Sequence, residues 1–240
     1  MQISVIIPMY NETSIIAETA KALSDYMTLN FETYEILFSD DGSIDGCGDV
    51  VRNLALPFVR VTGYQKNQGK GCAVRTAMLE AKGDFVMFTD ADLAYGTDVI
   101  RRAYDLWEKN GRPNLLIGSR NLGKDGYEGY TWVRKIMSKV YIKVLCLVGG
   151  FKLSDSQCGC KGFDQRASKE IFRRCKVNGF AFDFEAILWA DQLGFRITEM
   201  PVKIINHRES KIHIFRDTFR MLRDLRTIRK DVKKTAKAEK

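Results

Sequence analysis

Two aspartates, Asp90 and Asp92, directly follow the apolar run 85–88 and have the spacing of a metal-binding pair. Two carboxylates two residues apart at the end of a strand can converge on one divalent cation, and oxygen ligands suit Mg²⁺ or Mn²⁺. Such a cation would bridge a diphosphate and neutralise its charge as that group leaves. The same residues also suit a helix start, with Asp92 capping the turn before Thr97. Residue types alone leave both interpretations open.

A second pair of carboxylates, Asp40 and Asp41, follows the predicted strand 34–38 and precedes Gly42 and Ser43. A carboxylate at the end of a strand can accept hydrogen bonds from a ribose hydroxyl or a base N–H. Asp and Ser are equally common in turns and helix caps. The segment 66–71 reads Lys-Asn-Gln-Gly-Lys-Gly and resembles a phosphate-binding loop only loosely, because it lacks the Walker spacing and its Ser or Thr. Its glycines could equally serve close packing.

Elements that alternate along the chain must position these residues. The apolar pattern predicts strands at 3–7, 34–38, 58–62, 84–89 and 115–118, and helices at 13–29, 45–54, 69–82 and 97–110. Strands alternating with helices imply an α/β fold with a mostly parallel sheet, whose ligands lie beyond the carboxyl ends of the strands. The first turn, Pro-Met-Tyr-Asn-Glu, lacks the glycine fingerprint of dinucleotide-binding folds, so we do not expect NAD binding.

The second half of the chain is less regular. A glycine-containing loop is expected at 121–130, an extended segment at 155–163 and a final strand at 195–205, with helices at 132–147, 165–174 and 182–193. Near the C-terminus apolar residues recur every three or four positions, with Arg and Lys on the other faces: Phe215, Phe219, Leu222, Leu225, Ile228 and Val232. This spacing predicts a basic amphipathic helix.

The net charge of +8 is concentrated at the C-terminus. Residues 207–240 contain twelve Lys and Arg against five Asp and Glu, a net of +7, so the preceding 206 residues carry only +1. A fold that held nucleic acid would not partition its charge in this way. We therefore expect no nucleic-acid partner.

Taken together and in order, the motifs resemble those of family-two glycosyltransferases with the GT-A fold. The matching segments are Ser4 to Glu12, Asp40 to Ser43, Asn67 to Gly71, Asp90 to Asp92 and Gly118 to Arg120. Two further blocks, 155–163 and 180–185, resemble the polyprenyl-phosphate branch, which includes dolichyl-phosphate glucosyltransferases and dolichyl-phosphate mannose synthases. The resemblance extends from residue 3 to about residue 211. It implies a GT-A domain at 1–211, followed by the basic amphipathic tail at 212–240.

The resemblance also implies a role for each matched position. The nucleotide-sugar pocket would contain Pro8, Tyr10, Glu12, Asp40, Asp41, Lys70 and Asp90. The Mg²⁺ or Mn²⁺ ligands would be Asp90 and Asp92, and the residues at the reacting centre Asp92, Asp155 and Arg120. The acceptor phosphate would face Arg120, Arg134 and Ser138, and a loop closing over the pyrophosphate would carry Arg208, Ser210 and Lys211. For Arg134 the alternative is a solvated position on a helix.

The reaction implied is an inverting transfer of a hexose from a nucleotide sugar to polyprenyl phosphate, giving a β-linked product and a nucleoside diphosphate. A phosphate monoester has a second pKa of about 6, so it needs positioning by guanidinium groups more than it needs a general base. UDP-glucose is the favoured donor, because Ala94 stands where mannose synthases commonly have Gln. The block 155–159 is also nearer to the glucosyltransferases. The alternatives are GDP-mannose as donor, or a saccharide hydroxyl as acceptor with Asp155 as its general base.

Membrane contact is expected at the surface only. The segment 1–4 does not resemble a secretory signal, and the longest apolar run, 140–151, is shorter than the ~20 residues of a bilayer-spanning helix. We therefore expect a cytoplasmic protein that is peripheral on the cytoplasmic face of a membrane. Each cation of the tail would gain roughly 1 kcal/mol near an anionic leaflet. The alternative is a packed helix with a solvated Lys-rich end.

Overall fold

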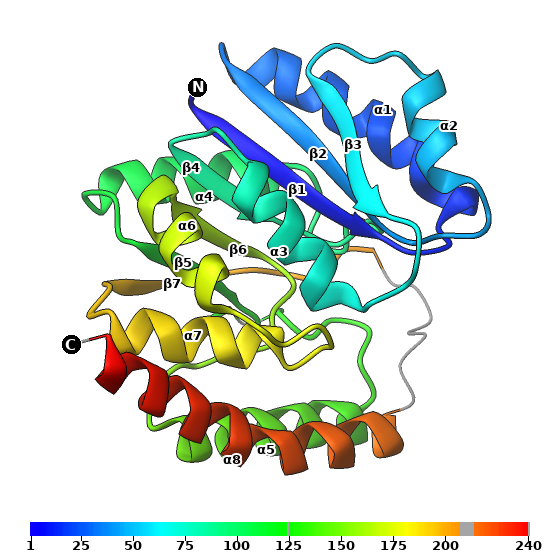
Figure 1. Ribbon diagram of the computed structural model, residues 1–240. Coiled ribbons are helices and arrows are strands. Elements are labelled where there is room, and N and C mark those ends of the chain that lie inside the picture. The colour runs from blue at the N-terminus through cyan, green and yellow to red at the C-terminus, as the bar shows by residue number, and fades with distance from the viewer. Residues whose placement is uncertain (124, 207–213, 240) are drawn as a thin grey trace.

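One seven-stranded sheet forms the centre of the molecule (Figure 1). The computed structural model describes residues 1–123, 125–206 and 214–239, and the side chains of all of these except 134 and 214–224. The strand order is β3-β2-β1-β4-β6-β5-β7, and β6 alone among them is antiparallel to its neighbours. The strands are β1 (Ile3–Met9), β2 (Tyr34–Asp41), β3 (Val59–Tyr64), β4 (Phe85–Phe88), β5 (Leu115–Ser119), β6 (Lys161–Asp164) and β7 (Ile197–Pro201). The predicted α/β fold with a mostly parallel sheet is confirmed.

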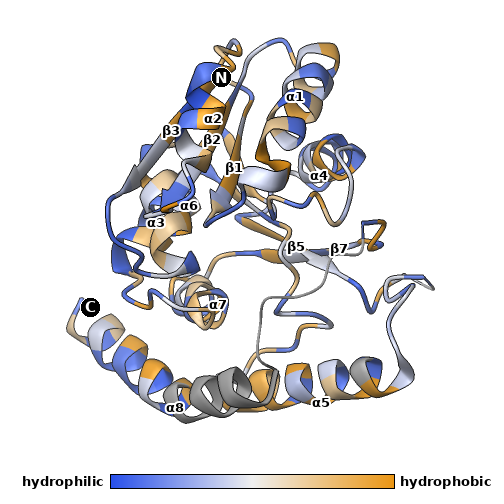
Figure 2. Cartoon of the chain, turned by 90° about the vertical axis from the view of Figure 1, so that its right-hand side faces the viewer, coloured by the Kyte–Doolittle hydropathy of each residue, from blue (hydrophilic) through white to orange (hydrophobic). Residues whose placement is uncertain are grey.

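Helices cover both faces of the sheet (Figures 1 and 2). They are α1 (Thr13–Asn30), α2 (Cys47–Asn53), α3 (Lys70–Glu80), α4 (Asp98–Lys109), α5 (Trp132–Gly149), α6 (Gln165–Arg174), α7 (Phe182–Gln192) and α8 (Ile214–Ala238). Helices α1, α2 and α4 pack on one face and α3, α6 and α7 on the other, so the sheet separates two apolar clusters. A strand buried on both faces is nearly continuous in apolar residues, which explains the run 3–7; its one polar side chain, Ser4, donates to Glu35.

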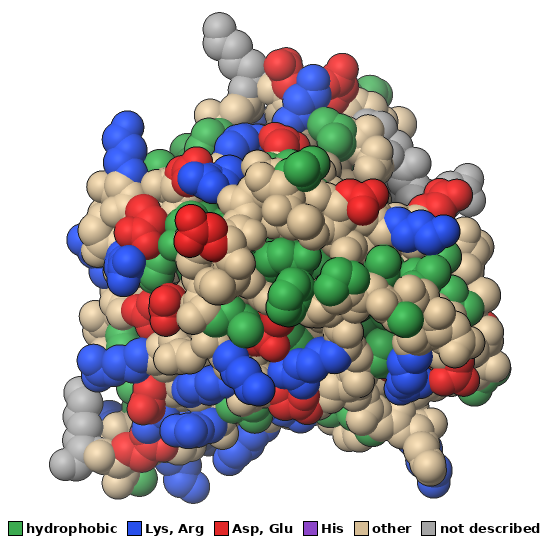
Figure 3. Space-filling view, turned by 90° about the horizontal axis from the view of Figure 1, so that it is seen from above, with side chains coloured by type: hydrophobic (Ala, Val, Ile, Leu, Met, Phe, Trp, Pro, Cys, Tyr) green, Lys and Arg blue, Asp and Glu red, His purple; other side chains and the backbone are tan. Residues whose placement is uncertain are grey.

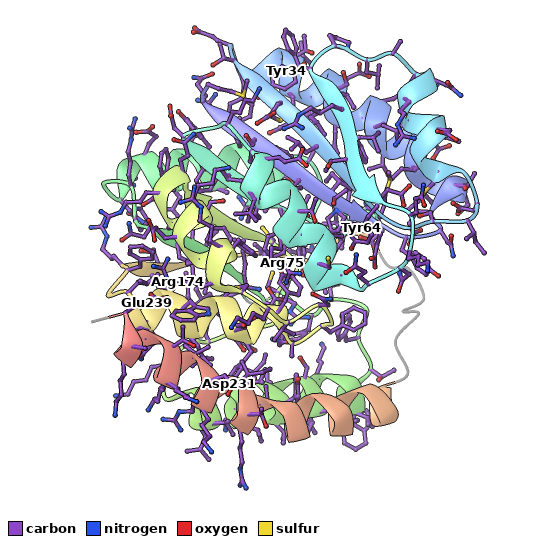
Figure 4. The ribbon with its side chains drawn as sticks, in the orientation of Figure 1. Tyr34, Tyr64, Arg75, Arg174, Asp231 and Glu239 are labelled. Carbon is purple, nitrogen blue, oxygen red and sulfur yellow. The ribbon has the colours of Figure 1, made fainter. Side chains whose placement is uncertain are left out.

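A further layer, made of α5 and α8, lies beyond α7 (Figures 1 and 2). The side chains from Phe182 to Ala190 are all buried in α7, because helices surround it. In α8 the apolar residues Leu225, Ile228 and Val232 belong to the same core cluster as α7. Arg174 of α6 forms an ion pair with Glu239 at 2.8 Å (Figure 4). The described part of α8 therefore turns its apolar side toward the core.

Two elements of the second half differ from the sequence-based expectation. The segment predicted to be extended at 155–163 forms a strand only from Lys161, and that strand lies between β4 and β5. It bonds to β4 in antiparallel register, with Phe85 opposite Asp164 and Phe88 opposite Lys161. The last strand is shorter than predicted and pairs with β5 alone. Both differences reflect long-range pairing, which local periodicity does not encode.

The surface seen in Figure 3 carries acidic and basic side chains that are interspersed among the described residues. None of the helices in the described ranges combines the length and the apolar character needed to cross a bilayer.

Candidate active site

The carboxyl ends of β1, β2 and β4 meet at one edge of the sheet. Met9 lies opposite Asp40 in the parallel register of β1 and β2. The N–H of Thr89, the residue before Asp90, donates to the carbonyl of Ile6. The polar segments that follow these three strands are therefore brought together, as the sequence predicted.

The turn after β1 is tied to the turn after β2. Asn11 has a left-handed φ of 53°, its N–H donates to the hydroxyl of Ser43, and its side-chain oxygen accepts from the N–H of Ile44. One residue earlier, the side chain of Tyr10 is 41% exposed. Asp40 accepts from the N–H of Ser43 at 2.9 Å and lines a cavity of about 470 Å³ between β2, β3 and α2. The exposed ring of Tyr10 and the carboxylate of Asp40 thus lie at this edge of the sheet.

The carboxylate of Asp41 anchors the loop before α3 through hydrogen bonds. Its buried carboxylate accepts hydrogen bonds from the hydroxyl of Tyr64, the amide of Asn67 and the N–H groups of Gln68 and Gly69, at 2.6 to 3.0 Å. Tyr64 ends β3 and lies at the same edge (Figure 4). Burial, together with this bond to Asp41, raises the pKa of Tyr64. The contacts that the structure gives Asp41 are structural, and they orient the loop that carries Lys70.

Lys70 and Asp90 form an ion pair at the centre of the edge, with 2.5 Å between the ammonium nitrogen and a carboxylate oxygen. Both side chains are partly exposed, at 25% and 31%. Burial favours the neutral amine, but Asp90, Asp183 and Asp92 outweigh it and raise the pKa of Lys70. Asp92, two residues on, accepts from the N–H of Ala94 at 3.1 Å. Three carboxylates thus surround one lysine ammonium.

Gly159 makes room for the carboxylate of Asp90. A Cβ atom at this position would lie 2.1 Å from one oxygen of Asp90. The N–H of Gly159 also donates to the hydroxyl of Tyr95 at 3.3 Å. The block 155–163 therefore contributes to the site through Gly159, which lies against Asp90, as well as through Asp155.

Arg120 and Asp155 form a second, buried ion pair. The guanidinium donates through Nε and Nη2 to the two oxygens of Asp155, at 2.7 and 3.0 Å, and the backbone N–H of Arg120 adds a third bond. Asp155 is fully buried and Arg120 is 9% exposed. Burial opposes the charge of Arg120, but its bonds to Asp155 hold its pKa above the usual range. Glu199 of β7 positions the segment that carries Asp155, because its carboxylate accepts hydrogen bonds from the N–H groups of Ser154 and Asp155.

The ring of Tyr127 connects this pair to α5. The guanidinium of Arg120 lies 5.3 Å from the centre of that ring, and the Tyr127 hydroxyl is 3.4 Å from the hydroxyl of Ser138. Arg134 lies one turn before Ser138 in α5, and its side chain is outside the described residues. Arg120 and Ser138 thus both contact Tyr127, which lies between them.

The predicted pyrophosphate loop, with Arg208, Ser210 and Lys211, lies outside the described residues. The described residues just before that loop lie close to the aspartates. The N–H of Ile205 donates to the carbonyl of Ala94, and the side-chain amide of Asn206 donates to the carbonyl of Leu93.

Sequence reasoning missed a third ion pair, between Lys161 of β6 and Asp183 of α7. The ammonium is buried, donates to Asp183 and to the carbonyl of Cys158, both at 2.7 Å, and lies 5.7 Å from the ring centre of Phe88. Burial raises the pKa of Asp183 despite Lys161. The charge of Asp183 acts on Lys70 and so connects this pair to the first one. Lys161 begins β6, which reads Lys-Gly-Phe-Asp, so local sequence gave no signal that this lysine is buried.

A metal would find its protein ligands in Asp90 and Asp92. Among the described residues there is no cluster of three or more His, Cys, Asp or Glu side chains with metal-binding geometry. Mg²⁺ and Mn²⁺ often take one or two carboxylates from the protein and the remaining oxygens from substrate phosphates. The partly exposed carboxylate of Asp90, with the space that Gly159 leaves around it, fits such a site.

Comparison with known proteins identifies the family of this chain. The model of the family described as "Glycosyl transferase family 2" matches residues 4–172. The dolichyl-phosphate beta-glucosyltransferase of Dictyostelium discoideum is 29% identical over 243 residues, which is 95% of this chain and 73% of that protein. A dolichyl-phosphate beta-glucosyltransferase of Trichomonas vaginalis is 30% identical over 211 residues, 84% of this chain and 65% of that protein.

A solved structure shares the fold. Glucosyl-3-phosphoglycerate synthase from Mycobacterium tuberculosis, crystallised with Mn²⁺, UDP and glucosyl-3-phosphoglycerate, superposes with a TM-score of 0.69 and 17% identity. The match covers 95% of this chain and 78% of the synthase.

Proposed function

Because this chain belongs to glycosyl transferase family 2, we propose that it transfers glucose from UDP-glucose to a polyprenyl phosphate of the dolichyl type. The transfer is inverting and gives a β-linked lipid phosphate sugar and UDP. The relatives named dolichyl-phosphate beta-glucosyltransferases support the sugar and the acceptor. The observation that carries the proposal is the pair Arg120–Asp155, a buried guanidinium held by a carboxylate four residues before Gly159, which lies against Asp90.

The donor binds at the edge formed by β1, β2 and β4. Pro8 near the end of β1 and Tyr10 and Glu12 in the turn after it face the nucleoside, and Asp40 accepts hydrogen bonds from its hydroxyl or N–H groups. Asp41 acts indirectly, because its bonds hold the loop 67–69 and thereby place Lys70. The ammonium of Lys70 forms an ion pair with Asp90 and is suited to the diphosphate.

Asp90 and Asp92 would hold a divalent cation, Mg²⁺ or Mn²⁺. That cation would supply stabilisation of the negative charge that develops on the leaving UDP. Lys70, which pairs with Asp90, is placed to donate to a phosphate oxygen. Arg208 and Lys211 would add positive charge to the pyrophosphate site, and the hydroxyl of Ser210 would donate a hydrogen bond to it.

The acceptor phosphate binds to Arg120, Arg134 and Ser138. Asp155 holds the guanidinium of Arg120 in one orientation, which lowers the entropy cost of aligning it with the phosphate. The phosphate is already ionised near neutral pH, with a second pKa of about 6, so its oxygen attacks the anomeric carbon without a base. Attack opposite the leaving diphosphate inverts that carbon.

A saccharide hydroxyl is the less well supported acceptor. That reaction requires a base that accepts a proton from the hydroxyl, and Asp155 is the candidate residue. Its carboxylate is fully buried and accepts three hydrogen bonds from Arg120 and one from the N–H of Gln157. This environment suits an orienting carboxylate better than a base.

The protein binds the cytoplasmic surface of a membrane through α5. Five large apolar side chains of this helix are between 46% and 81% exposed: Trp132, Val133, Ile136, Val140 and Leu147. A helix with such a face lies in the headgroup region with its apolar side toward the acyl chains. The basic residues of α8 add attraction to anionic lipids, since its described apolar residues pack against the core.

The test is the transfer of radiolabelled sugar to a short polyprenyl phosphate, with UDP-glucose and GDP-mannose in parallel, each with Mg²⁺ or EDTA. The proposal predicts label in the organic phase from UDP-glucose and its loss with EDTA. Label from GDP-mannose alone would show that the transferred sugar is mannose and not glucose. No lipid label from either donor, with nucleotide binding intact, would refute the lipid acceptor and favour the saccharide hydroxyl.

A further inference from the structure

Two glycines flank Lys70, the first residue of α3. Gly69 has a positive φ of 109°, and neither Gly69 nor Gly71 has the Cβ atom that restricts the backbone of other residues. A residue between two glycines can place its side chain in many directions. The ammonium of Lys70 nevertheless meets the carboxylate of Asp90. Contacts from other parts of the chain must therefore fix the backbone at this point.

The carbonyl of Asn178 closes the first turn of α3. It accepts from the N–H of Gly71 at 2.7 Å and from the N–H of Cys72 at 3.3 Å. The N–H groups in the first turn of a helix need such partners from outside the regular helix pattern. A Cβ atom at Gly69 would lie 2.5 Å from the carbonyl oxygen of Asn178, and one at Gly71 would lie 2.6 Å from that of the preceding residue. The glycines therefore allow the segment around Asn178 to pack closely on the start of α3.

Glu185 of α7 anchors the segment that carries Asn178. Its carboxylate accepts hydrogen bonds from the N–H of Lys176, at 2.9 and 3.0 Å, and from the N–H of Val177, at 2.8 Å. Glu185 is only 5% exposed and belongs to a helix whose residues are buried from 182 to 190. Arg75 of α3, labelled in Figure 4, donates to the side-chain oxygen of Asn178 at 2.7 Å. A buried carboxylate is thus joined through a short backbone segment to the start of α3.

Two carboxylates therefore fix the backbone on the two sides of Lys70. Asp41 accepts from the N–H groups just before it, and Glu185 holds the segment 176–178 that binds the N–H groups just after it. We propose that Glu185 is a positioning residue of the donor site, which holds the Lys70 ammonium where the donor diphosphate binds. This inference rests on the proposed function, because it takes Lys70 to contact that diphosphate.

A double-mutant cycle on the full chain tests whether Glu185 acts through Lys70. Calorimetry with Mg²⁺ present measures the Kd of UDP and of uridine, which lacks the diphosphate. Lys70→Met should raise the Kd of UDP about tenfold and Glu185→Ala about fivefold, and each should change the Kd of uridine by less than about twofold. In the Lys70→Met background, Glu185→Ala should raise the Kd of UDP by less than about twofold, because the interaction that it supports is already lost.

A conservative variant and a matched control separate positioning from stability. Glu185→Gln keeps an oxygen that can accept from the N–H of Val177, so it should raise the Kd of UDP only about twofold. Glu80→Ala removes a carboxylate at the other end of α3, where it accepts from Arg60 and Thr62. This control should lower the unfolding midpoint and leave the Kd of UDP unchanged.

A second route to the same segment is available if Glu185→Ala does not fold. Arg75→Met releases the side chain of Asn178 and should raise the Kd of UDP about threefold. That effect should also disappear in the Lys70→Met background.

The inference would be overturned if Glu185→Ala had the same effect with and without Lys70, or weakened UDP and uridine equally. Unchanged UDP affinity in Lys70→Met would overturn it as well. The proposed function fails differently, by coupling of the two residues in UDP binding with no transfer of sugar to any polyprenyl phosphate. That outcome would support the positioning role and refute the lipid acceptor.

Discussion

The two ion pairs of the candidate site differ in burial and in geometry. Lys70 and Asp90 meet through a single contact and are 25% and 31% exposed, whereas Arg120 and Asp155 meet through two parallel bonds and are 10% and 0% exposed. A partly solvated single contact is weak and can be exchanged for a ligand, while a buried two-pronged contact is not readily broken. In the proposed reaction, the pair on the donor side is therefore suited to exchange with a ligand and the pair on the acceptor side to a fixed orientation.

Breaking the buried pair should have the largest effect on stability. Asp155→Asn leaves the Arg120 guanidinium buried without a charged partner, so we expect a loss of about 3 to 5 kcal/mol in the free energy of unfolding. Urea denaturation monitored by circular dichroism measures it.

A double variant separates charge from packing at the same place. Arg120→Met combined with Asp155→Leu removes both charges and should recover much of the stability while leaving transfer abolished. If Asp155→Asn alone changes the stability by less than about 1 kcal/mol, the pair is not the rigid element that we describe.

A side chain added beside Asp90 should lower stability less than Asp155→Asn does, but it should change the metal dependence of transfer. Gly159→Ala places a methyl group where the Asp90 carboxylate now lies, so that side chain must rotate away from Lys70. We expect about 1 kcal/mol of destabilisation and a higher Mn²⁺ concentration for half-maximal transfer.

The matched control is Gly179→Ala, because no atom lies within 4 Å of a Cβ at that position. Its metal dependence and unfolding midpoint should match those of the native chain. Equal effects at the two glycines would show that the space beside Asp90 does not matter.

Removing the exchangeable charge should affect activity far more than stability. Asp90→Asn should change the free energy of unfolding by less than about 1 kcal/mol, because both side chains are partly solvated. Transfer should fall by about a hundredfold or more, because in the proposed reaction the Asp90 carboxylate holds the cation that stabilises the leaving diphosphate. Steady-state kinetics on the folded variant would check this, and near-native turnover would remove Asp90 from the site.

The smallest effect should come from Asp45, which ties the start of α1 to the turn after β2. It accepts from the N–H groups of Thr13 and Cys47. Partial burial opposes ionisation, but these bonds prevail and lower the pKa of Asp45 to about 2. A lowered pKa in the folded state stabilises it above pH 4, and this contribution is lost as the pH falls from about 4 to 2.

Asp45→Asn should therefore lose less stability than the native chain over that pH range. Urea midpoints at pH 7, 4 and 3 provide the comparison. A native chain that is no more acid-sensitive than the variant would show that the turn does not depend on this carboxylate.

The same contrast explains what the sequence could predict. The alternating elements and the polar strand ends are local patterns, so the parallel sheet and the clustering of Asp40, Asp90 and Asp92 followed directly from them. The anchoring role of Asp41 was not predictable, because its partners lie 23 to 28 residues further along the chain.

On the acceptor side nearly every decisive contact is long-range. The insertion of β6 between β4 and β5 places Lys161 against Asp183, and β7 brings Glu199 to Ser154. Residue spacing does not predict these pairings, because they depend on how segments far apart in the sequence pack together. Arg120 and Asp155 themselves were found only through their resemblance to a family.

The central claim is that the fixed guanidinium of Arg120 binds an already ionised phosphate and that no base is used. The direct test is the pH profile of kcat/KM for the acceptor between pH 5 and 8, measured with a prenyl phosphate and with a prenyl phosphonate of different second pKa. The account predicts a rise whose midpoint, about pH 6 for the phosphate, moves with the second pKa of the acceptor. A midpoint that stays the same for both acceptors would identify an enzyme base and contradict the account.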